Sequence, residues 1–433
     1  MIVSRISPTA RLIADRYQDI FRERAIPYSM LSLLIVMTLC GFPSLSEFVR
    51  FCAFSRSVSA LSRAIGKSDK ELVNRARRRH AWSVLKRVRT SPDDWIWAVD
   101  TTSNRKRTKG LEGGGKWANS KDEIFEGQNM MVIAAVNKKT GQATPVAWRP
   151  CLKATERKIN TNHDLVPLML KELLEQQWPK LTVVMDSWFD SAELLQVLSQ
   201  MGLTYVVQLK SSRLAKFHPG PRHSRFKLKE LFQGMKKKGA LSFTRENAIP
   251  EFTPVTKMTF LAKLNLWIPG KGDGKKQMGL NVIAAYNHPK DPEAFGYYAT
   301  NNLSASSTWC WNMCRCRWNI EVCFRDLRQG LRWGQFAAKT PQGAELAFLL
   351  PILIQGILHE KDASTPLLTK LSKLRNSEML AALEFHVANP KNQQLQRLKS
   401  TLGNQAACKK VKITTAEKEQ ARTNCKKRSS MAA

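Results

Sequence analysis

Two short apolar segments, each followed directly by an aspartate, constrain the possible folds of this chain most strongly. Residues 95–99 precede Asp100, and residues 181–185 precede Asp186. Their length and their aromatic or β-branched side chains are typical of strands that are buried in a sheet. They therefore predict two buried strands that end at aspartates. A carboxylate in this position points into the crevice where α/β sheets bind their ligands.

Helices and further strands are predicted to alternate around these two segments. Residues 129–148 are predicted to form a β-hairpin, and residues 205–209 a further strand. Helices are predicted over residues 164–177 and 191–200. This order of elements predicts an α/β fold whose core is a mixed sheet.

The alternation stops at residues 211–299, which contain short strand-like segments and many basic residues. We therefore expect a β-rich insertion in a core formed by residues 93–210 and 300–362. Residues 363–433 are expected to form a C-terminal helical region and a basic, disordered tail.

Residues 1–92 are predicted to form an all-helical domain that precedes the core. A basic helix at its end contains Arg75, Arg78 and Arg79. Arginine is a better phosphate ligand than lysine, because its planar guanidinium can donate two parallel hydrogen bonds. We therefore expect these three residues to bind DNA, with a solvated basic face as the alternative.

The overall charge predicts a polyanionic partner. The 433 residues include 69 Lys+Arg and 35 Asp+Glu, which gives a formal net charge of +34. Hydrophobic residues make up 43% of the chain, enough for a sizeable core, so a disordered basic protein is excluded. Nucleic acid is the commonest polyanion for such a surface, and its binding should weaken as the salt concentration rises.

The cysteines and the apolar segments predict a cytoplasmic protein without membrane contact. No secretory signal is predicted, so the nine cysteines are expected to be reduced thiols. Four of them lie within residues 310–323, but without the paired spacing of zinc sites. Segment 30–42 is too short to span a bilayer, and segment 344–358 is interrupted by Pro351, so we expect two buried helices.

A third carboxylate, Glu321, lies in a predicted helix that is rich in arginine. Since one helical residue turns by about 100°, Arg317, Arg325 and Arg328 lie within about 40° of Glu321 on the helix surface. A carboxylate flanked by guanidinium groups suits a site that holds metal ions and nucleic-acid phosphates together. The three arginines are therefore candidate DNA ligands.

Asp100, Asp186 and Glu321 together form a candidate metal site. Mg²⁺ prefers a few carboxylate ligands and keeps its other positions for water and phosphate. Three carboxylates suit two such ions about 4 Å apart, one beside the attacking oxygen and one beside the leaving oxygen, and Mn²⁺ could substitute. Either aspartate alone could instead cap a turn, but the combination with Glu321 favours metal ligation.

Three segments resemble the signature blocks of bacterial DDE transposases of the insertion-sequence-four family. They are residues 99–102, residues 184–189, and Arg317 with Glu321 and Arg328. The resemblance implies an RNase H-like catalytic core with a β-rich insertion between the second aspartate and the glutamate. It also implies Mg²⁺-dependent cleavage at transposon ends and strand transfer into target DNA, which is a cut-and-paste reaction.

The same resemblance implies the partners and the location. The substrate would be double-stranded DNA, comprising the inverted repeats at the transposon ends and the target, and a homodimer would form the synaptic complex. Such an enzyme would be cytoplasmic and associated with the nucleoid. In relatives that cut through a DNA hairpin, an aromatic ring stacks on a flipped base. Phe295, Tyr297 and Tyr298 are candidates here, with plain strand packing as the alternative.

The third block departs from the family pattern at two positions. Cys314 stands where the family has tyrosine, and Arg328 stands where it has lysine. Arginine keeps the charge that binds phosphate, whereas cysteine lacks the ring and the hydroxyl of tyrosine.

Two other functions stay open. The chain could be another metal-dependent nuclease on the same core, which would cut DNA without joining it to a target. It could also be a non-catalytic DNA-binding protein derived from a transposase, which would tolerate the loss of Glu321.

Overall fold

The structure is a computed structural model of the chain. It describes residues 8–23, 26, 28–41, 59, 62–63, 65, 70–105, 113–118, 123–152, 162–219, 224–246, 259–269, 277–334, 341–362 and 365–375. Residues 376–433, which include the predicted basic tail, lie outside these residues.

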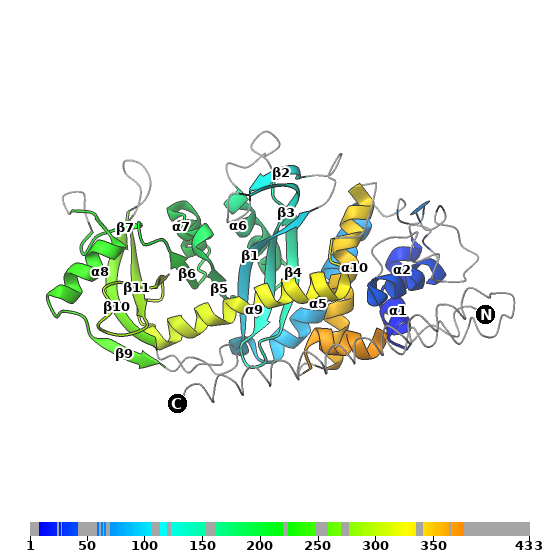
Figure 1. Ribbon diagram of the computed structural model, residues 1–433. Helices are drawn as coiled ribbons and strands as arrows, with labels where there is room; N and C mark the ends of the chain where they lie inside the picture. Colours follow the sequence, from blue (N-terminus) through cyan, green and yellow to red (C-terminus); the bar gives the residue numbers. More distant parts are fainter. Residues whose placement is uncertain are drawn as a thin grey trace, which may run out of the picture.

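One mixed sheet of ten strands forms the centre of the described part of the chain (Figure 1). The strands are, in spatial order, β2 (Gly114–Ala118), β3 (Ile124–Asn137), β1 (Trp95–Arg105), β5 (Thr182–Met185), β6 (Tyr205–Leu209), β12 (Gly296–Thr300), β11 (Met278–Tyr286), β10 (Thr259–Ile268) and β9 (Phe243–Glu246), with β4 (Ala143–Pro150) paired to β3. Strands β1, β5 and β6 are parallel, and the pairs that flank them are antiparallel. This confirms the predicted α/β fold with a mixed sheet.

The two apolar segments followed by aspartates are neighbouring strands. β1 and β5 pair in parallel, and the last pair joins Val99 to Met185. The prediction that the first strand ends at Asp100 is wrong, because β1 continues to Arg105. Residues 100–105 keep their antiparallel pairing with β3, and these backbone hydrogen bonds hold the chain extended although its side chains become polar.

Strands β9 to β12 extend the same sheet. β12 pairs antiparallel with β6, and β11, β10 and β9 follow in order. The β-rich segment predicted at residues 211–299 also contains a helix, α8 (Leu228–Lys237), and a small separate pair, β7 (Leu214–Ala215) with β8 (Phe226–Lys227). Because the sheet is continuous across this segment, its division from the core stays a prediction.

On one face of the sheet, strand and helix side chains form a large buried hydrophobic cluster. Ile96 and Ala98 of β1 belong to it. The helices that share this cluster are α1 (Pro8–Arg22), α2 (Tyr28–Cys40), α5 (Lys70–Thr90), α9 (Ser307–Leu331) and α10 (Pro341–Lys361). Helices α2 and α10 contain the two apolar segments, which are therefore buried helices as predicted. Among the described residues, no helix has the length and apolar character needed to cross a bilayer.

The opposite face of the sheet carries a second buried cluster. Trp97 and Val99 belong to it, because successive side chains of a strand point to opposite faces. Helices α6 (Leu165–Glu175) and α7 (Ala192–Gln200) contribute to this cluster together with α8. The sheet is therefore the middle layer of three, and helix α9 runs along one of its faces (Figure 1).

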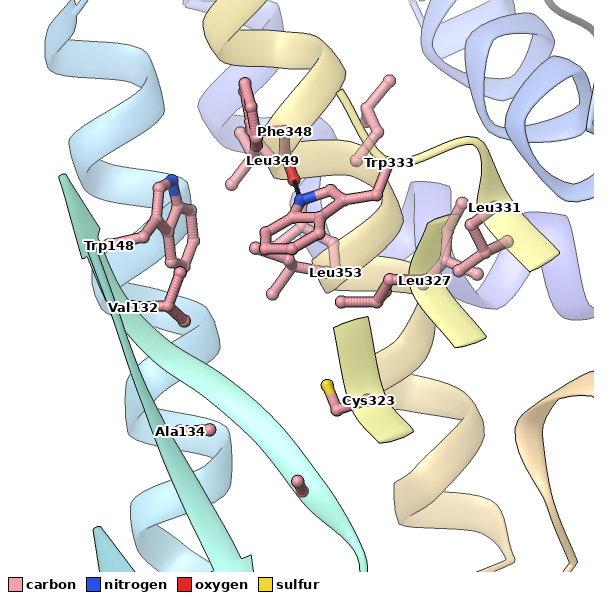
Figure 2. Close-up of a cluster of buried hydrophobic side chains, with 14 of the residues drawn as sticks. Val132, Ala134, Trp148, Cys323, Leu327, Leu331, Trp333, Phe348, Leu349 and Leu353 are labelled. Carbon is pink, nitrogen blue, oxygen red and sulfur yellow. Dashed lines mark hydrogen bonds between the residues drawn. The ribbon is translucent and has the colours of Figure 1, made fainter. Parts of the chain in front are cut away.

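Trp333 connects helices α9 and α10 within the first cluster (Figure 2). Its side chain is 1% exposed, and its Nε1–H donates to the carbonyl oxygen of Phe348 at 2.9 Å. Its ring also stacks on Phe324 of α9, with ring centroids 5.5 Å apart. The residue therefore fixes α10 against the helix that carries Glu321.

The fold should lose stability in mild acid because His80 and His359 are buried. Burial lowers the pKa of His80 to about 4 and that of His359 to about 3, so both are neutral in the folded chain. An unfolded histidine has a pKa of about 6.5. As the pH falls below this value, the unfolded chain binds protons that the folded chain does not bind. The free energy of unfolding should then fall by up to about 1.4 kcal/mol per pH unit for each histidine.

Urea unfolding above and below the unfolded histidine pKa measures this loss. We expect a lower midpoint on the acid side for the natural chain. Equal midpoints at both pH values would contradict the prediction.

Candidate active site

Asp100 and Asp186 occupy equivalent positions at the carboxyl end of the paired segment of β1 and β5. The parallel pairing ends at Val99 and Met185, so each aspartate is the next residue along its chain. Asp186 Oδ1 also accepts a hydrogen bond from the Trp188 N–H at 2.9 Å. Both acids therefore lie at one edge of the β1–β5 pairing.

Glu321 is brought to the same region by helix α9, which packs across β1, β5 and β6. The helix begins after Ser306, whose Oγ accepts a hydrogen bond from the Trp309 N–H at 3.0 Å. Ile320 and Phe324 are buried in the first cluster and hold the helix on the sheet. Glu321 follows Ile320 directly, so the packing of this helix determines the position of its carboxylate.

Arg317 connects two of the three acids. Its Nη1 donates to Asp100 Oδ2 at 3.0 Å, and its Nη2 donates to Glu321 Oε1 at 2.6 Å. The side chains of Arg317, Asp100 and Glu321 are 16%, 14% and 35% exposed. The structure thus brings together Asp100, Glu321 and Arg317 in a largely buried ion-paired group.

The electrostatics of this group couple all three acids. Burial raises the pKa of Asp100 to about 7, and the negative charges of Asp186 and Glu321 add to the increase, against the opposing effect of Arg317. Burial works to lower the pKa of Arg317, but Asp100 and Glu321 outweigh it and the pKa is raised. The site therefore holds more negative charge than one guanidinium balances.

The donor set fits a divalent metal ion in its chemistry. Asp100, Asp186 and Glu321 offer the hard oxygen ligands that Mg²⁺ prefers, and a divalent cation would relieve their mutual repulsion. Within the described residues, no three acid, thiol or imidazole side chains are grouped closely enough to hold a metal ion as they stand. Arg317 contacts two of the predicted ligands instead.

This acid group lies inside a segment with a recognisable family. Residues 91–355, which are more than half of the chain, match the family described as Transposase DDE domain. The chain belongs to this family. The matched segment of this DDE transposase contains Asp100, Asp186 and Glu321. Membership implies nuclease or transposition activity in general terms, and members generally use divalent metal ions.

Among solved structures, this DDE transposase has a distant likeness to a piggyBac transposase in a synaptic complex with hairpin DNA. The two share 12% sequence identity and a TM-score of 0.38, and the likeness covers 85% of this chain and 74% of that chain. A likeness at this level assigns neither a site nor an activity. A comparison with curated proteins finds no match.

The other two arginines of the predicted stripe on α9 differ in their surroundings. Arg328 donates from Nε to the Phe324 carbonyl oxygen at 3.3 Å, and burial lowers its pKa while Asp100 opposes this change. Arg325 is 56% exposed and pairs with Asp326 at 3.5 Å. Binding of DNA by either arginine stays a prediction.

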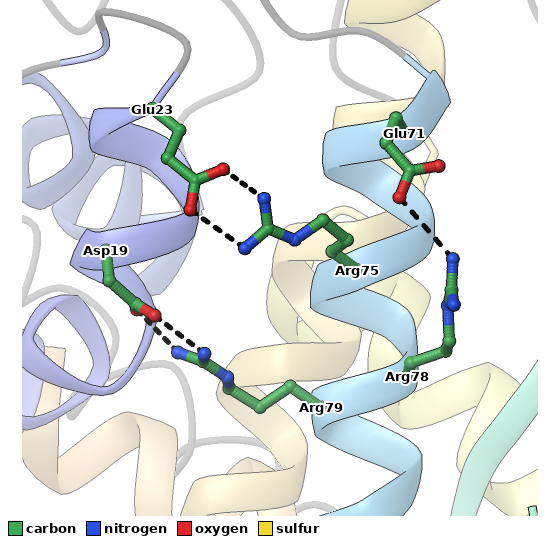
Figure 3. Close-up of polar contacts among 6 residues, drawn as sticks. All are labelled: Asp19, Glu23, Glu71, Arg75, Arg78 and Arg79. Atoms are coloured by element: carbon green, nitrogen blue, oxygen red, sulfur yellow. Dashed lines mark hydrogen bonds and ion pairs between the residues drawn. The ribbon is translucent and has the colours of Figure 1, made fainter.

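The arginines predicted to bind DNA on α5 (Lys70–Thr90) form ion pairs of their own (Figure 3). Arg79 donates to both carboxylate oxygens of Asp19 at 2.5 and 2.6 Å, and Arg75 donates to Glu23, so both face α1. Arg78 pairs with Glu71 of its own helix at 3.5 Å and is 60% exposed. DNA binding through these residues stays a prediction, and Arg78 is the most accessible of the three.

The aromatic candidates for base stacking have different exposures. Tyr297 is 3% exposed and packs against Phe232, with centroids 5.6 Å apart, so its ring belongs to the core. Phe295 is 49% exposed and meets Trp311 edge to face at 6.0 Å. Tyr298 also packs edge to face on Trp311, at 5.4 Å. Phe295 is therefore the candidate with the most accessible ring.

Cys314 of α9, at the usual tyrosine position of the third block, lies close to an aromatic residue of strand β12. Burial raises the pKa of Tyr298 on β12, and the Cys314 thiol and the Arg317 guanidinium also act on it. Tyr298 therefore supplies an aromatic ring near Cys314 and Arg317, although Cys314 itself has no ring. The sequence alone carried no signal for this proximity, because the two residues come from different elements.

Asp190, a further acid near Asp186, is engaged elsewhere. Its side chain is 1% exposed, it pairs with Arg213 at 3.4 Å, and its Oδ2 accepts from the Lys210 N–H at 3.1 Å. Burial raises its pKa. These contacts anchor the segment that follows Asp186 to the end of β6.

Proposed function

We propose that this chain is a cut-and-paste DNA transposase of the insertion-sequence-four group. Its catalytic core would be RNase H-like and would comprise residues 93–210 and 300–362, with residues 211–299 as an insertion. The observation that carries the proposal is that Asp100 of β1 and Asp186, directly after β5, lie at one edge of the paired strands, and that Arg317 of α9 links Asp100 to Glu321, all inside the matched DDE domain.

The proposed chemistry is two successive in-line phosphoryl transfers. Water first attacks a phosphodiester at the end of the element, and the bond to the 3′ oxygen breaks to leave a free 3′-OH. This 3′-OH then attacks a phosphodiester of the target, forming one P–O bond while another breaks. Neither step needs a covalent enzyme intermediate.

Asp100, Asp186 and Glu321 would hold the divalent metal, with Mg²⁺ as the proposed ion and two ions per site. When bound, such ions supply activation of the attacking oxygen and stabilisation of the leaving oxygen. The rigid strands β1 and β5 fix two of the carboxylates, and α9 fixes the third. Arg328, which is close enough to Asp100 for their charges to interact, would hold a DNA phosphate beside them.

The remaining surface would bind DNA by charge. A formal net charge of +34 favours attachment to the transposon ends and to the target, and the proposed DNA-binding domain, residues 1–92, would contribute Arg78 to this contact. The proposed synaptic complex contains a homodimer, and the proposed location is the nucleoid in the cytoplasm.

The products formed on DNA test this proposal. Purified protein should be incubated with Mg²⁺ and a duplex of the sequence that flanks its gene, together with a supercoiled target plasmid. We expect cleaved ends with free 3′-OH groups and, in addition, plasmid joined covalently to these ends. The Glu321→Gln variant should give neither product.

Other products would favour the alternatives. Cleavage without joining, under conditions where both DNAs are bound, would indicate another metal-dependent nuclease on the same core. Full biological function of the Glu321→Gln variant would instead indicate a non-catalytic DNA-binding protein.

A further inference from the structure

We propose that Arg317 is a positioning residue that occupies the metal ligands in the free protein, so that metal binding depends on DNA binding. In this arrangement the guanidinium takes the place of a cation until a DNA phosphate draws it away. The inference rests on the proposed function and extends it, because it assigns an order to the binding of DNA and metal.

The contacts of Arg317 point directly to this role. Each of its two terminal nitrogens donates to a different carboxylate, at 3.0 Å to Asp100 Oδ2 and at 2.6 Å to Glu321 Oε1. These are charge-assisted hydrogen bonds, which are about twice as strong as neutral ones. The same oxygens are the proposed metal ligands, so guanidinium and metal compete for them.

Because Arg317 is largely buried, a metal ion cannot easily displace it from Asp100 and Glu321 unless another anion binds the guanidinium. Arg317 is only 16% exposed, and a guanidinium with so little water around it needs a neighbouring anion. If a divalent cation entered beside it, the two positive charges would repel each other at short range. A metal ion alone therefore has to displace a guanidinium that is already paired. Within the described acid group, Asp186 is the one other carboxylate that the displaced guanidinium could pair with.

A DNA phosphate offers that alternative partner. Guanidinium binds phosphate with two parallel hydrogen bonds, so Arg317 can exchange two carboxylate contacts for two phosphate contacts. The released Asp100 and Glu321 would then be free for metal ions, next to the same phosphate. Binding of DNA and metal should consequently be cooperative, and each should tighten the other by the same factor.

Binding of Mn²⁺, followed by electron paramagnetic resonance without any turnover, tests the proposal. The natural chain, Arg317→Gln and Arg315→Gln should each be titrated alone and with a duplex of the sequence that flanks the gene. Arg315 lies on the same helix and is partly buried, but it is not paired with Asp100 or Glu321. The Arg315→Gln variant therefore controls for the loss of one positive charge from α9.

We expect DNA to tighten Mn²⁺ binding to the natural chain roughly tenfold or more, since a charge-assisted contact no longer opposes it. Without DNA, Arg317→Gln should bind Mn²⁺ roughly tenfold more tightly than the natural chain, and DNA should add little. Arg315→Gln should behave like the natural chain. Thermal unfolding of each variant checks that it is folded.

The opposite results would overturn the proposal in distinguishable ways. If Arg317→Gln binds Mn²⁺ more weakly than the natural chain, Arg317 supports the metal ligands and does not compete with metal. If DNA leaves the Mn²⁺ affinity of the natural chain unchanged, the coupling is absent, although the transposase proposal survives when cleavage is still observed. If the natural chain binds no Mn²⁺ even with DNA, both proposals fail.

Discussion

Replacement of Asp186 by asparagine is expected to lower the rate of DNA cleavage by more than about 100-fold, since even indirect partners of metal ligands contribute about 10–100-fold. The variant removes one negative charge from the proposed metal site. It keeps an oxygen that can accept the hydrogen bond from the Trp188 N–H, now made at 2.9 Å by Asp186. We therefore expect a folded protein whose affinity for DNA is nearly unchanged.

Single-turnover cleavage of labelled duplex, with binding measured separately by gel shift, checks this prediction. Asp94→Asn is the matched control, because Asp94 lies just before β1 and pairs with Lys139 at 2.7 Å, away from the acid group. Its cleavage rate should stay within about twofold of the natural rate, as for most surface substitutions. Cleavage by Asp186→Asn at a rate close to that of Asp94→Asn would remove Asp186 from the active site.

Truncation of Trp333 to alanine is expected to lower the free energy of unfolding by about 3–5 kcal/mol. The indole ring is fully buried between α9 and α10, and its loss leaves a cavity among the side chains shown in Figure 2. It also leaves the carbonyl oxygen of Phe348 without the indole donor, now at 2.9 Å. Since α9 carries Arg317 and Glu321, the same change should disturb the acid group.

Denaturant unfolding of Trp333→Ala and Trp82→Ala separates this effect from the loss of any tryptophan. Trp82 of α5 is 44% exposed, and the guanidinium carbon of Arg89 lies 5.1 Å from the centroid of its ring. Its truncation should therefore lower the free energy of unfolding by less than about 1 kcal/mol. A similar loss of stability in the two variants would show that Trp333 does not have the central packing role assigned to it.

The strands and helices that carry the candidate site were predictable because their patterns are local. Residues 95–99 and 181–185 are short, mostly apolar segments, and segments of this length and composition are typical of buried strands in an α/β chain. The arginines around Glu321 follow the helical period, which is a property of the backbone alone. The end of β1 was not predictable in this way, because its extension to Arg105 depends on pairing with β3.

The partners of charged residues were the least predictable feature. Arg75 and Arg79 looked like free phosphate ligands in the sequence, yet in the structure Arg79 pairs with Asp19 of α1 and Arg75 pairs with Glu23, directly after α1. Arg317 likewise suggested a phosphate contact, and the structure places it on two carboxylates. An ion pair depends on which side chains meet in space, and a distant acid leaves no trace in the local pattern.

The sequence by itself determined the alternation of strands and helices, the three acids and the basic character of the chain, since period, residue type and charge are properties of the chain alone. Only the tertiary structure decided that β1 and β5 are adjacent, that α9 lies across them and that Arg317 stands between Asp100 and Glu321. The contact between Asp100 and Arg317 joins residues more than 200 positions apart, and it arises from packing on a shared sheet. The sequence therefore supplies the residues of the candidate active site, and the tertiary packing brings them together.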